Sequence, residues 1–458
     1  MDVAVVPFLW ILPLSIYLIT FIICFDKDGW YLRGVWMSLL VVSLVLITRL
    51  MFLEFTANSA SLEYQIFVYC FALFTCCMVC HGELARRRSS VPYLTTFYLY
   101  VALGGAVGGV FVNLIAPVLF TGFWELHIAL VGTVILAGVC IGIDNSLIKT
   151  KQHLTAFASA WSIATVVFIG ILVTQVQDGR SSSIYVNRSF FGVLYVDDWD
   201  ANTAEHERQL YHGRIQHGRQ LVRGNVQRIP TSYYGLDTGV AAAIQRHPRR
   251  SSANPAEHGL NIGAIGLGVG TISTYGTSAD SIHYYEINPD VEHVARNYFF
   301  YLKNGKAATD IVLGDARISM QRELETGGSN EFDVLILDAF SGDAVPVHLL
   351  TDEAFDLYEK HLSNDGILAA HISNDYLDLS PVIRNAAQRL NMDAVWIEGP
   401  ADRWYEDGND WVLMSRNKEL IGSDLIRSTQ SEWNDAVPKP IRWTDDFSNL
   451  IEVIVWGD

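Results

Sequence analysis

The segment that decides the fold of this chain lies between residues 260 and 346. It contains four short apolar runs, each ending in glycine or an acidic residue: LNIGAIGLGVGT (260–271), SIHYYEINPDV (281–291), IVLGDAR (311–317) and FDVLILDAFSGDAVP (332–346). TISTYGTSAD follows the first run and EHVARNYFFYLKN follows the second, and both can form helices. This alternation of strands and helices predicts a parallel, doubly wound sheet. Because such a sheet binds its ligand at the carboxyl ends of its strands, where these glycines and acids fall, the segment predicts a nucleoside-binding site.

The composition divides the chain of 458 residues into two parts. The first 176 residues contain eight basic and eight acidic residues, whereas the remainder contains 24 basic and 41 acidic residues. The formal net charge of −17 therefore belongs to the C-terminal part. An acidic surface argues against nucleic acid as a partner, because nucleic-acid binding requires a basic surface.

All six cysteines lie in the apolar N-terminal part. Cys76, Cys77 and Cys80 share one apolar run, and no cluster of histidines or acids lies with them inside it. Small helix residues are therefore favoured over a metal site, and we expect no metal in this protein. The C-terminal part has no cysteine, so it has no disulfide framework.

The N-terminal part contains a series of uncharged or nearly uncharged runs. They cover residues 4–25 and about 34–53, 64–81, 92–120, 126–143 and 153–176. Each is close to the roughly 20 residues that a bilayer requires. We therefore expect a helical multi-pass membrane domain over residues 1–177, with about six spans and the lipid bilayer as a partner.

The charges of the loops leave the orientation of this domain open. Two basic segments, Arg86–Arg88 and Lys149–Lys151, are separated by two spans, so both can be cytoplasmic. The span at 153–176 then places everything after Gln177 on the outer side of the membrane. A nucleoside cofactor is normally cytosolic, so the charge rule and the predicted site conflict.

A small β unit is expected between the membrane part and the sheet. SIYVNRSFFGVLYVDD alternates in polarity and is rich in aromatic residues, which is typical of strands. We interpret residues 183–230 as an antiparallel β unit and residues 231–458 as the nucleoside-binding domain. His212 and His217 fall in the β unit, and packing in turns is favoured over a metal pair.

The ligand contacts of the sheet follow from its strand ends. The Gly-rich loop lets the backbone approach a ligand at Gly266, Gly268 and Gly270, although such a loop is a weak signal by itself. Glu286 ends the second strand and can accept hydrogen bonds from ribose hydroxyls. Asp315 ends the third strand and can accept from an adenine amino group, and Asp338 ends the fourth strand facing the reacting centre. Each acid alone could equally be a helix N-cap, but together they predict a nucleoside site.

This combination resembles the spermidine/spermine synthase family, of the class I S-adenosylmethionine-dependent transferase fold, over roughly residues 185–420. The remainder is similar to bacterial multi-pass proteins that carry such a domain, in FLWILPLSIYLITF (8–21), CHGELARRR (80–88), LTTFYLYVALGGAVGGVF (94–111) and WTDDFSNL (443–450). The resemblance implies a helical multi-pass membrane domain followed by an α/β doubly wound, Rossmann-like domain. It also implies a location in the bacterial inner membrane and allows a homodimer.

The resemblance further implies transfer of an aminopropyl group from decarboxylated S-adenosylmethionine to a small amine, by direct displacement at the carbon next to a sulfonium. It makes Asp338 the catalytic carboxylate, which deprotonates or positions the attacking amine. Glu286 and Asp315 then match the ribose and adenine contacts. The residues implied in substrate binding are Gln220, Tyr233, Tyr234, Asp343 and His371.

Three positions depart from the family pattern and keep other functions open. Val269 stands where synthases carry Asp in the Gly-rich loop, and Ala264 stands where methyltransferases carry an acid, so the loop favours neither S-adenosylmethionine nor its decarboxylated form. His371 stands where synthases tend to have Gln, and it could act as a base or cap the sheet edge. The alternatives are an S-adenosylmethionine-dependent methyltransferase, and a transport or sensing protein that binds a nucleoside or polyamine without turnover.

Overall fold

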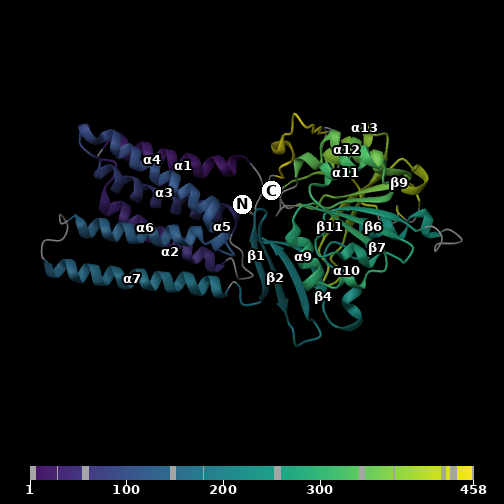
Figure 1. Ribbon diagram of the computed structural model, residues 1–458, viewed down its shortest axis with the longest axis horizontal. Helices are drawn as coiled ribbons and strands as arrows, with labels where there is room; N and C mark the ends of the chain where they lie inside the picture. Colours follow the sequence, from purple (N-terminus) through teal and green to yellow (C-terminus); the bar gives the residue numbers. More distant parts are fainter. Residues whose placement is uncertain are drawn as a thin grey trace. The chain divides into compact units, whose positions relative to one another are not determined.

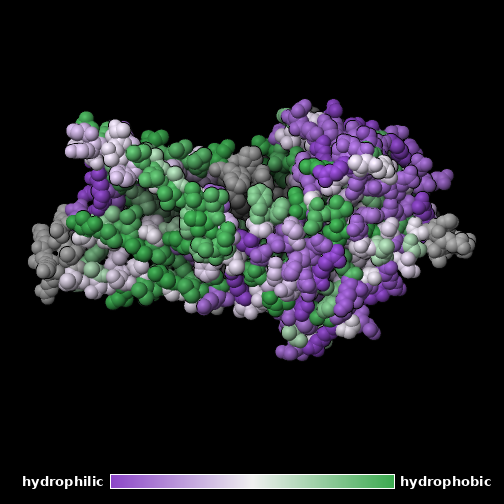
Figure 2. Space-filling view, in the orientation of Figure 1, coloured by the Kyte–Doolittle hydropathy of each residue, from purple (hydrophilic) through white to green (hydrophobic). Residues whose placement is uncertain are grey.

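The computed structural model describes residues 7–27, 29–53, 61–144, 151–178, 180–251, 259–339, 346–374, 377–423, 426, 430–433 and 441–455. These residues belong to two compact units, a helical one within residues 6–182 and an α/β one within residues 183–458. Figure 2 shows apolar residues over most of the visible face of the helical unit, whereas hydrophilic residues predominate on the visible face of the α/β unit.

The helical unit is built mainly from long apolar helices, with one short helix, α5 (Figure 1). They are α1 (Pro7–Asp26), α2 (Arg33–Leu53), α3 (Leu62–Arg86), α4 (Leu94–Val110), α5 (Ala116–Leu119), α6 (Glu125–Ile143) and α7 (Lys151–Asp178), with a 3₁₀ turn at Val91–Tyr93 and a π-helical turn at Phe111–Ile115. Within the described residues, five helical stretches are long and apolar enough to cross a membrane, and α1 adds a shorter apolar stretch, Ile11–Asp26. Long helices therefore occur where the sequence predicts about six spans.

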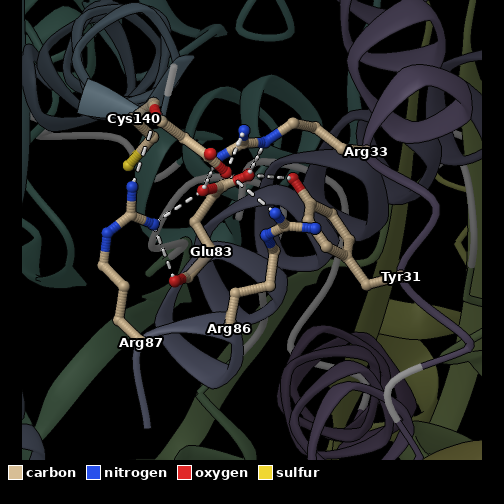
Figure 3. A network of polar contacts seen from close by, with 7 residues as sticks. Tyr31, Arg33, Glu83, Arg86, Arg87 and Cys140 are labelled. Carbon is tan, nitrogen blue, oxygen red and sulfur yellow. Dashed lines mark hydrogen bonds and ion pairs between the residues drawn. The ribbon is translucent and has the colours of Figure 1, made fainter. Parts of the chain in front are cut away.

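The ends of α2, α3 and α6 meet around a buried carboxylate. Glu83, near the end of α3, is 2% exposed and accepts hydrogen bonds from the Tyr31 hydroxyl (2.9 Å) and from the guanidiniums of Arg33 (2.6 Å) and Arg87 (2.7 Å) (Figure 3). Arg33 and Arg87 also donate to the main-chain oxygen of Cys140 on α6. A buried carboxylate is tolerated only when it is paired in this way, so these contacts hold the three helix ends together.

A second carboxylate extends the same network. Asp144, directly after α6, accepts from Arg33 (2.9 Å) and from Arg86 (2.8 Å). Because α2 begins at Arg33 while α3 and α6 end beside it, α2 runs antiparallel to the other two helices. We refer to Tyr31, Arg33, Glu83, Arg86, Arg87, Cys140 and Asp144 as the Glu83 network.

The α/β unit contains two sheets. A four-stranded antiparallel sheet has the order β1-β2-β3-β4 and consists of β1 (Ser183–Ser189), β2 (Gly192–Trp199), β3 (Glu207–His212) and β4 (Ile215–Leu221). A seven-stranded sheet has the order β10-β11-β9-β8-β5-β6-β7 and consists of β5 (Asn261–Ile265), β6 (Ser281–Glu286), β7 (Ala308–Leu313), β8 (Phe332–Leu337), β9 (Leu362–His371), β10 (Asp393–Gly399) and β11 (Asn409–Ser415). β11 runs antiparallel to both of its neighbours, β10 and β9, and the other adjacent strands of this sheet pair in parallel.

Helices cover the larger sheet on both faces (Figure 1). They are α8 (Gly239–Gln245), α9 (Pro289–Tyr298), α10 (Tyr301–Asn304), α11 (Ala316–Thr326), α12 (Asp352–His361), α13 (Ser380–Arg389) and α14 (Lys418–Ile421). Alternate residues of the fully buried strand β8 explain the two layers, because Val334 packs in one core with Val240 of α8, and Leu335 packs in the other with Phe355 of α12. The predicted fold class, a helical region followed by a doubly wound α/β domain, is confirmed.

The order of the strands locates the binding edge. The chain enters the sheet at β5, proceeds to β6 and β7 on one side, and then returns to β8 on the other side. The reversal lies between β5 and β8, and ligands bind at such a switch point, outside the carboxyl ends of the strands. One expected element differs: residues 271–280, predicted as a helix, contain only the 3₁₀ turn Thr271–Thr274. The segment is rich in Thr, Ser and Gly, which are poor helix formers, and Asp280 accepts hydrogen bonds from Thr277 in a local turn instead.

Candidate active site

A cavity of about 230 Å³ lies at this edge of the sheet. Its lining includes residues after β5, β6, β7 and β8, and residues of the small β unit such as Phe191, Leu194 and Leu210. Six of the residues predicted from the sequence line it: Tyr233, Gly266, Gly268, Glu286, Asp315 and Asp338. The predicted strand-end residues are therefore brought together by the parallel sheet.

The three glycines of the loop have different roles. Gly266 (φ +102°) allows the chain to pass the Asp338 carbonyl, because a Cβ there would collide with that oxygen. Gly268 (φ +52°) lies against the main-chain oxygen of His217 in the β unit. Gly270 (φ +83°) packs instead against Leu302, and it is not among the residues of the cavity wall. The sequence predicts a cofactor contact for Gly270, but in the structure this residue packs against Leu302 outside the cavity wall.

Val269 fills the space between the loop and the β unit. It is 1% exposed and shares an apolar cluster with Leu194 and Phe299. A Cβ added to Gly218 would lie 2.7 Å from its side chain. The position where synthases carry a loop acid is thus turned into the protein, so this loop presents no carboxylate to the cavity at that point.

Glu286 ties the end of β6 to the Gly-rich loop. Its carboxylate accepts the backbone N–H of Leu267 (3.1 Å) and of Asn288 (2.8 Å). Burial raises the pKa of Glu286 to about 6, although the backbone hydrogen bonds act in the opposite direction. The group lines the cavity, and its remaining acceptor positions suit the hydroxyls of a ribose.

Asp315 both caps a helix and lines the cavity. Its Oδ1 accepts the backbone N–H of Ile318 (3.0 Å) in the first turn of α11, so the N-cap alternative is what the structure contains. Its Oδ2 lies 2.8 Å from Nε2 of His348. His348 belongs to the cavity wall but was not predicted, since no motif marks it in the loop after the fourth strand.

Three predicted residues, His371, Tyr234 and Tyr233, lie around Asp338, which directly follows β8. Its Oδ1 lies 2.7 Å from Nδ1 of His371, and its Oδ2 accepts the hydroxyl of Tyr234. Tyr233 lines the cavity and stacks on the His371 ring with centroids 4.5 Å apart. Burial, followed by the Asp338 carboxylate, raises the pKa of both tyrosines well above the usual value, so both are protonated donors at neutral pH.

One predicted substrate residue, Gln220, does not join this group. Gln220 is 1% exposed and lies outside the cavity wall. Its amide donates to the main-chain oxygen of Gln227 (2.8 Å) and accepts the N–H of Phe300 (2.7 Å), so it holds the β unit against the segment before α10. The predicted substrate contact of Gln220 is therefore corrected to a structural one, while Asp343 lies outside the described residues.

Two histidines of the β unit line the cavity, with ring centroids 5.7 Å apart. His212 bonds to the main-chain oxygen of Phe191. Burial, with the neighbouring His212, lowers the pKa of His217 to about 3, so this imidazole is neutral. Across the described ranges, no group of three or more histidines, cysteines or acids could hold a metal ion.

Comparison with curated proteins finds two relatives. A polyamine aminopropyltransferase of Vibrio vulnificus is 34% identical over 112 residues, which make up 23% of this chain and 36% of that enzyme. An N-terminal histidine N-methyltransferase of Emericella nidulans is 31% identical over 124 residues, or 26% of this chain and 21% of that enzyme. The chain thus spans well under half the length of either relative. No family model matches the chain.

Solved structures of low identity are also similar to this chain. A probable spermidine synthase from Corynebacterium glutamicum has 17% identity and a TM-score of 0.40, and covers 50% of this chain and 79% of its own. A spermidine synthase from Thermotoga maritima has 15% identity and a TM-score of 0.37, with 58% and 82% covered. Human methyltransferase-like protein 13 in complex with SAH has 15% identity and a TM-score of 0.31, with 43% and 92% covered.

The strand order, the Gly-rich loop and the three strand-end acids define a class I methyltransferase-like domain. Within that class, the resemblance to spermidine synthases that the sequence predicts is confirmed by the polyamine aminopropyltransferase relative.

Proposed function

We propose that the α/β unit transfers an aminopropyl or related group from decarboxylated S-adenosylmethionine to a small amine. The observation that carries this proposal is the charge of the cavity wall. Its described residues include the carboxylates of Glu286, Asp315 and Asp338, and no lysine or arginine. A sulfonium donor with a terminal ammonium and a polyamine acceptor are both cationic, so this wall suits them electrostatically.

Asp338 is the residue we assign to the chemistry. An amine attacks carbon only when its nitrogen lone pair is free, so its proton must pass to a base. The new C–N bond forms as the C–S bond breaks, and the electron pair of the latter stays on sulfur, which leaves a neutral thioether nucleoside. Asp338 takes the proton, while Glu286 and Asp315 hold the nucleoside in line with the amine.

Methyl transfer is the second candidate, and the relative that acts as an N-methyltransferase favours it. S-adenosylmethionine differs from the decarboxylated donor by one carboxylate. Among the described residues of the wall, no cationic side chain is available to pair with that group. The decarboxylated donor, and hence aminopropyl transfer, therefore fits the cavity better than S-adenosylmethionine and methyl transfer.

The helical unit is proposed to cross a bilayer, which would place the protein in the inner membrane of a bacterium. The support is the outward distribution of apolar side chains: α4 buries none of its residues, and Val45, Val107 and Val166 are each more than half exposed. A helix bundle in water would turn polar residues outward instead. Resistance of the protein to extraction from membranes by alkaline carbonate tests this directly.

Calorimetry and product analysis of the full chain in detergent test the transferase function. We expect methylthioadenosine and decarboxylated S-adenosylmethionine to bind, and putrescine to be aminopropylated. Asp338→Asn should reduce turnover by about 10²–10⁴-fold and change nucleoside affinity by less than about tenfold. Methylated products would favour the second candidate, and binding without any product would favour a transport or sensing role.

A further inference from the structure

The side chain that contacts Asp338 most closely from the sheet is His371, at the end of β9. Nδ1 of His371 lies 2.7 Å from Oδ1 of Asp338, and both side chains are 5% exposed. His371 therefore lies at the centre of the site.

Two aromatic rings stack on the imidazole. Tyr233 stacks at a centroid distance of 4.5 Å with 24° between the planes, and Trp411 stacks at 4.7 Å with 19°. Trp411 lies directly opposite His371 in the pairing of β9 with β11. Packing therefore fixes the ring plane, and the hydrogen bonds to Asp338 and Ser373 select which way the two nitrogens point.

The hydrogen bonds on the two sides of the ring assign the tautomer. On the Asp338 side, a carboxylate can only accept, so Nδ1 of His371 carries a proton and donates a hydrogen bond to Oδ1. On the other side, Nε2 lies 2.8 Å from Oγ of Ser373, and that same oxygen accepts the backbone N–H of Asp410 (2.7 Å). The Ser373 hydroxyl keeps its own proton and can donate it in a hydrogen bond to the unprotonated Nε2.

We infer that His371 is a positioning residue for the Asp338 base. Its Nδ1–H and the Tyr234 hydroxyl each occupy one carboxylate oxygen. The Asp338 carboxylate is thereby held in one orientation, with its remaining lone pairs available to the cavity. The inference rests on the proposed function in that Asp338 is taken as the base.

The test compares His371→Gln with His371→Leu in the full chain in detergent. Gln keeps an N–H donor and Leu removes it, so we expect His371→Leu to lower kcat about 10–100-fold and His371→Gln to lower it less than about fivefold, with methylthioadenosine affinity unchanged in both. Equal kcat values in the wild type and His371→Leu would overturn the inference.

A matched control and a readout without turnover complete the experiment. His361 is fully buried in the same unit, away from the cavity, and bonds to the main-chain oxygen of Met320, so His361→Gln should leave kcat unchanged. In ¹⁵N-histidine-labelled protein, the His371 resonances are identified by their absence in His371→Gln. In the wild type, these resonances should show a proton on Nδ1. Protonation at Nε2 would overturn the assigned donation even if the wild type turned over no substrate, whereas failure of the wild type to transfer any group would count against the proposed function alone.

Discussion

Val269 of the Gly-rich loop lies against Gly218 of the β unit, so closely that a Cβ at position 218 would come within 2.7 Å of its Cγ2. Gly218 has φ of +137°, which side chains rarely adopt. The pair explains how a loop without the synthase acid is accommodated: the two surfaces are packed together as an apolar contact.

Replacing Val269 by the acid that synthases carry should therefore destabilise the protein and provide no new ligand contact. In Val269→Asp, a carboxylate would be buried among Leu194 and Phe299 without a partner, and we expect a loss of about 3 kcal/mol or more in the free energy of unfolding. Thermal unfolding of the full chain measures it, with the exposed Val455→Asp as the matched control. An unchanged Tm together with tighter binding of the decarboxylated donor would contradict the packing account.

The pKa of Glu286, raised by burial to about 6 from the usual 4.5, predicts pH-dependent nucleoside binding. A protonated carboxyl loses acceptor capacity, so the affinity for methylthioadenosine should fall several-fold as the pH is lowered through about 6. Calorimetry between about pH 5 and about pH 7.5 tests this, and Glu286→Gln should bind more weakly with no such dependence. A flat profile in the wild type would argue against a ribose contact.

Protonation of Glu286 should weaken nucleoside binding, but it should stabilise the folded state. Because the folded state binds the Glu286 proton more tightly than the unfolded chain, the associated stabilisation is complete below about pH 4.5 and is lost as the pH rises through about 6. Binding and stability linked to this residue should therefore change in opposite directions across the same window.

Removal of the buried carboxylate should destabilise the helical unit. In Glu83→Gln, Arg33 would keep its charge, 7% exposed, without its closest anionic partner. We expect a loss of about 3–5 kcal/mol, as found for breaking a buried pair from one side. Thermal stability in detergent measures it against Glu63→Gln, an exposed position on the same helix. A Tm as high as that of the control would show that the network contributes little.

The helix directions predict where two reporters should appear. Three stretches that can cross a membrane, Val91–Leu119, Glu125–Ile143 and Thr155–Gln177, separate Arg88 from Arg180. Reporters fused after these residues should therefore lie on opposite sides of the bilayer, with the basic Arg86–Arg88 end in the cytoplasm. Detection of both on the same side would mean that one of the three stretches does not cross.

The sequence alone predicted the parallel sheet and the edge of that sheet at which the site lies. Apolar runs that end in glycine or acid, alternating with helical segments, specify a parallel sheet, and the carboxyl ends of its strands meet at one edge. For this reason Gly266, Glu286 and Asp338 could be assigned to one site without coordinates. The positions of the long apolar helices followed in the same way from the lengths of the uncharged runs.

Only the tertiary structure decided what individual side chains do within that frame. His371 and Tyr234 are distant from Asp338 in the chain and reach it through strand pairing and the segment before α8, a relationship that no local pattern encodes. The amide of Gln220 is tied to two backbone groups, and Val269 is turned away from the cavity, because each side chain follows the packing around it. Periodicity and strand ends determine where a site lies, whereas the orientation of each group depends on neighbours far away in the sequence.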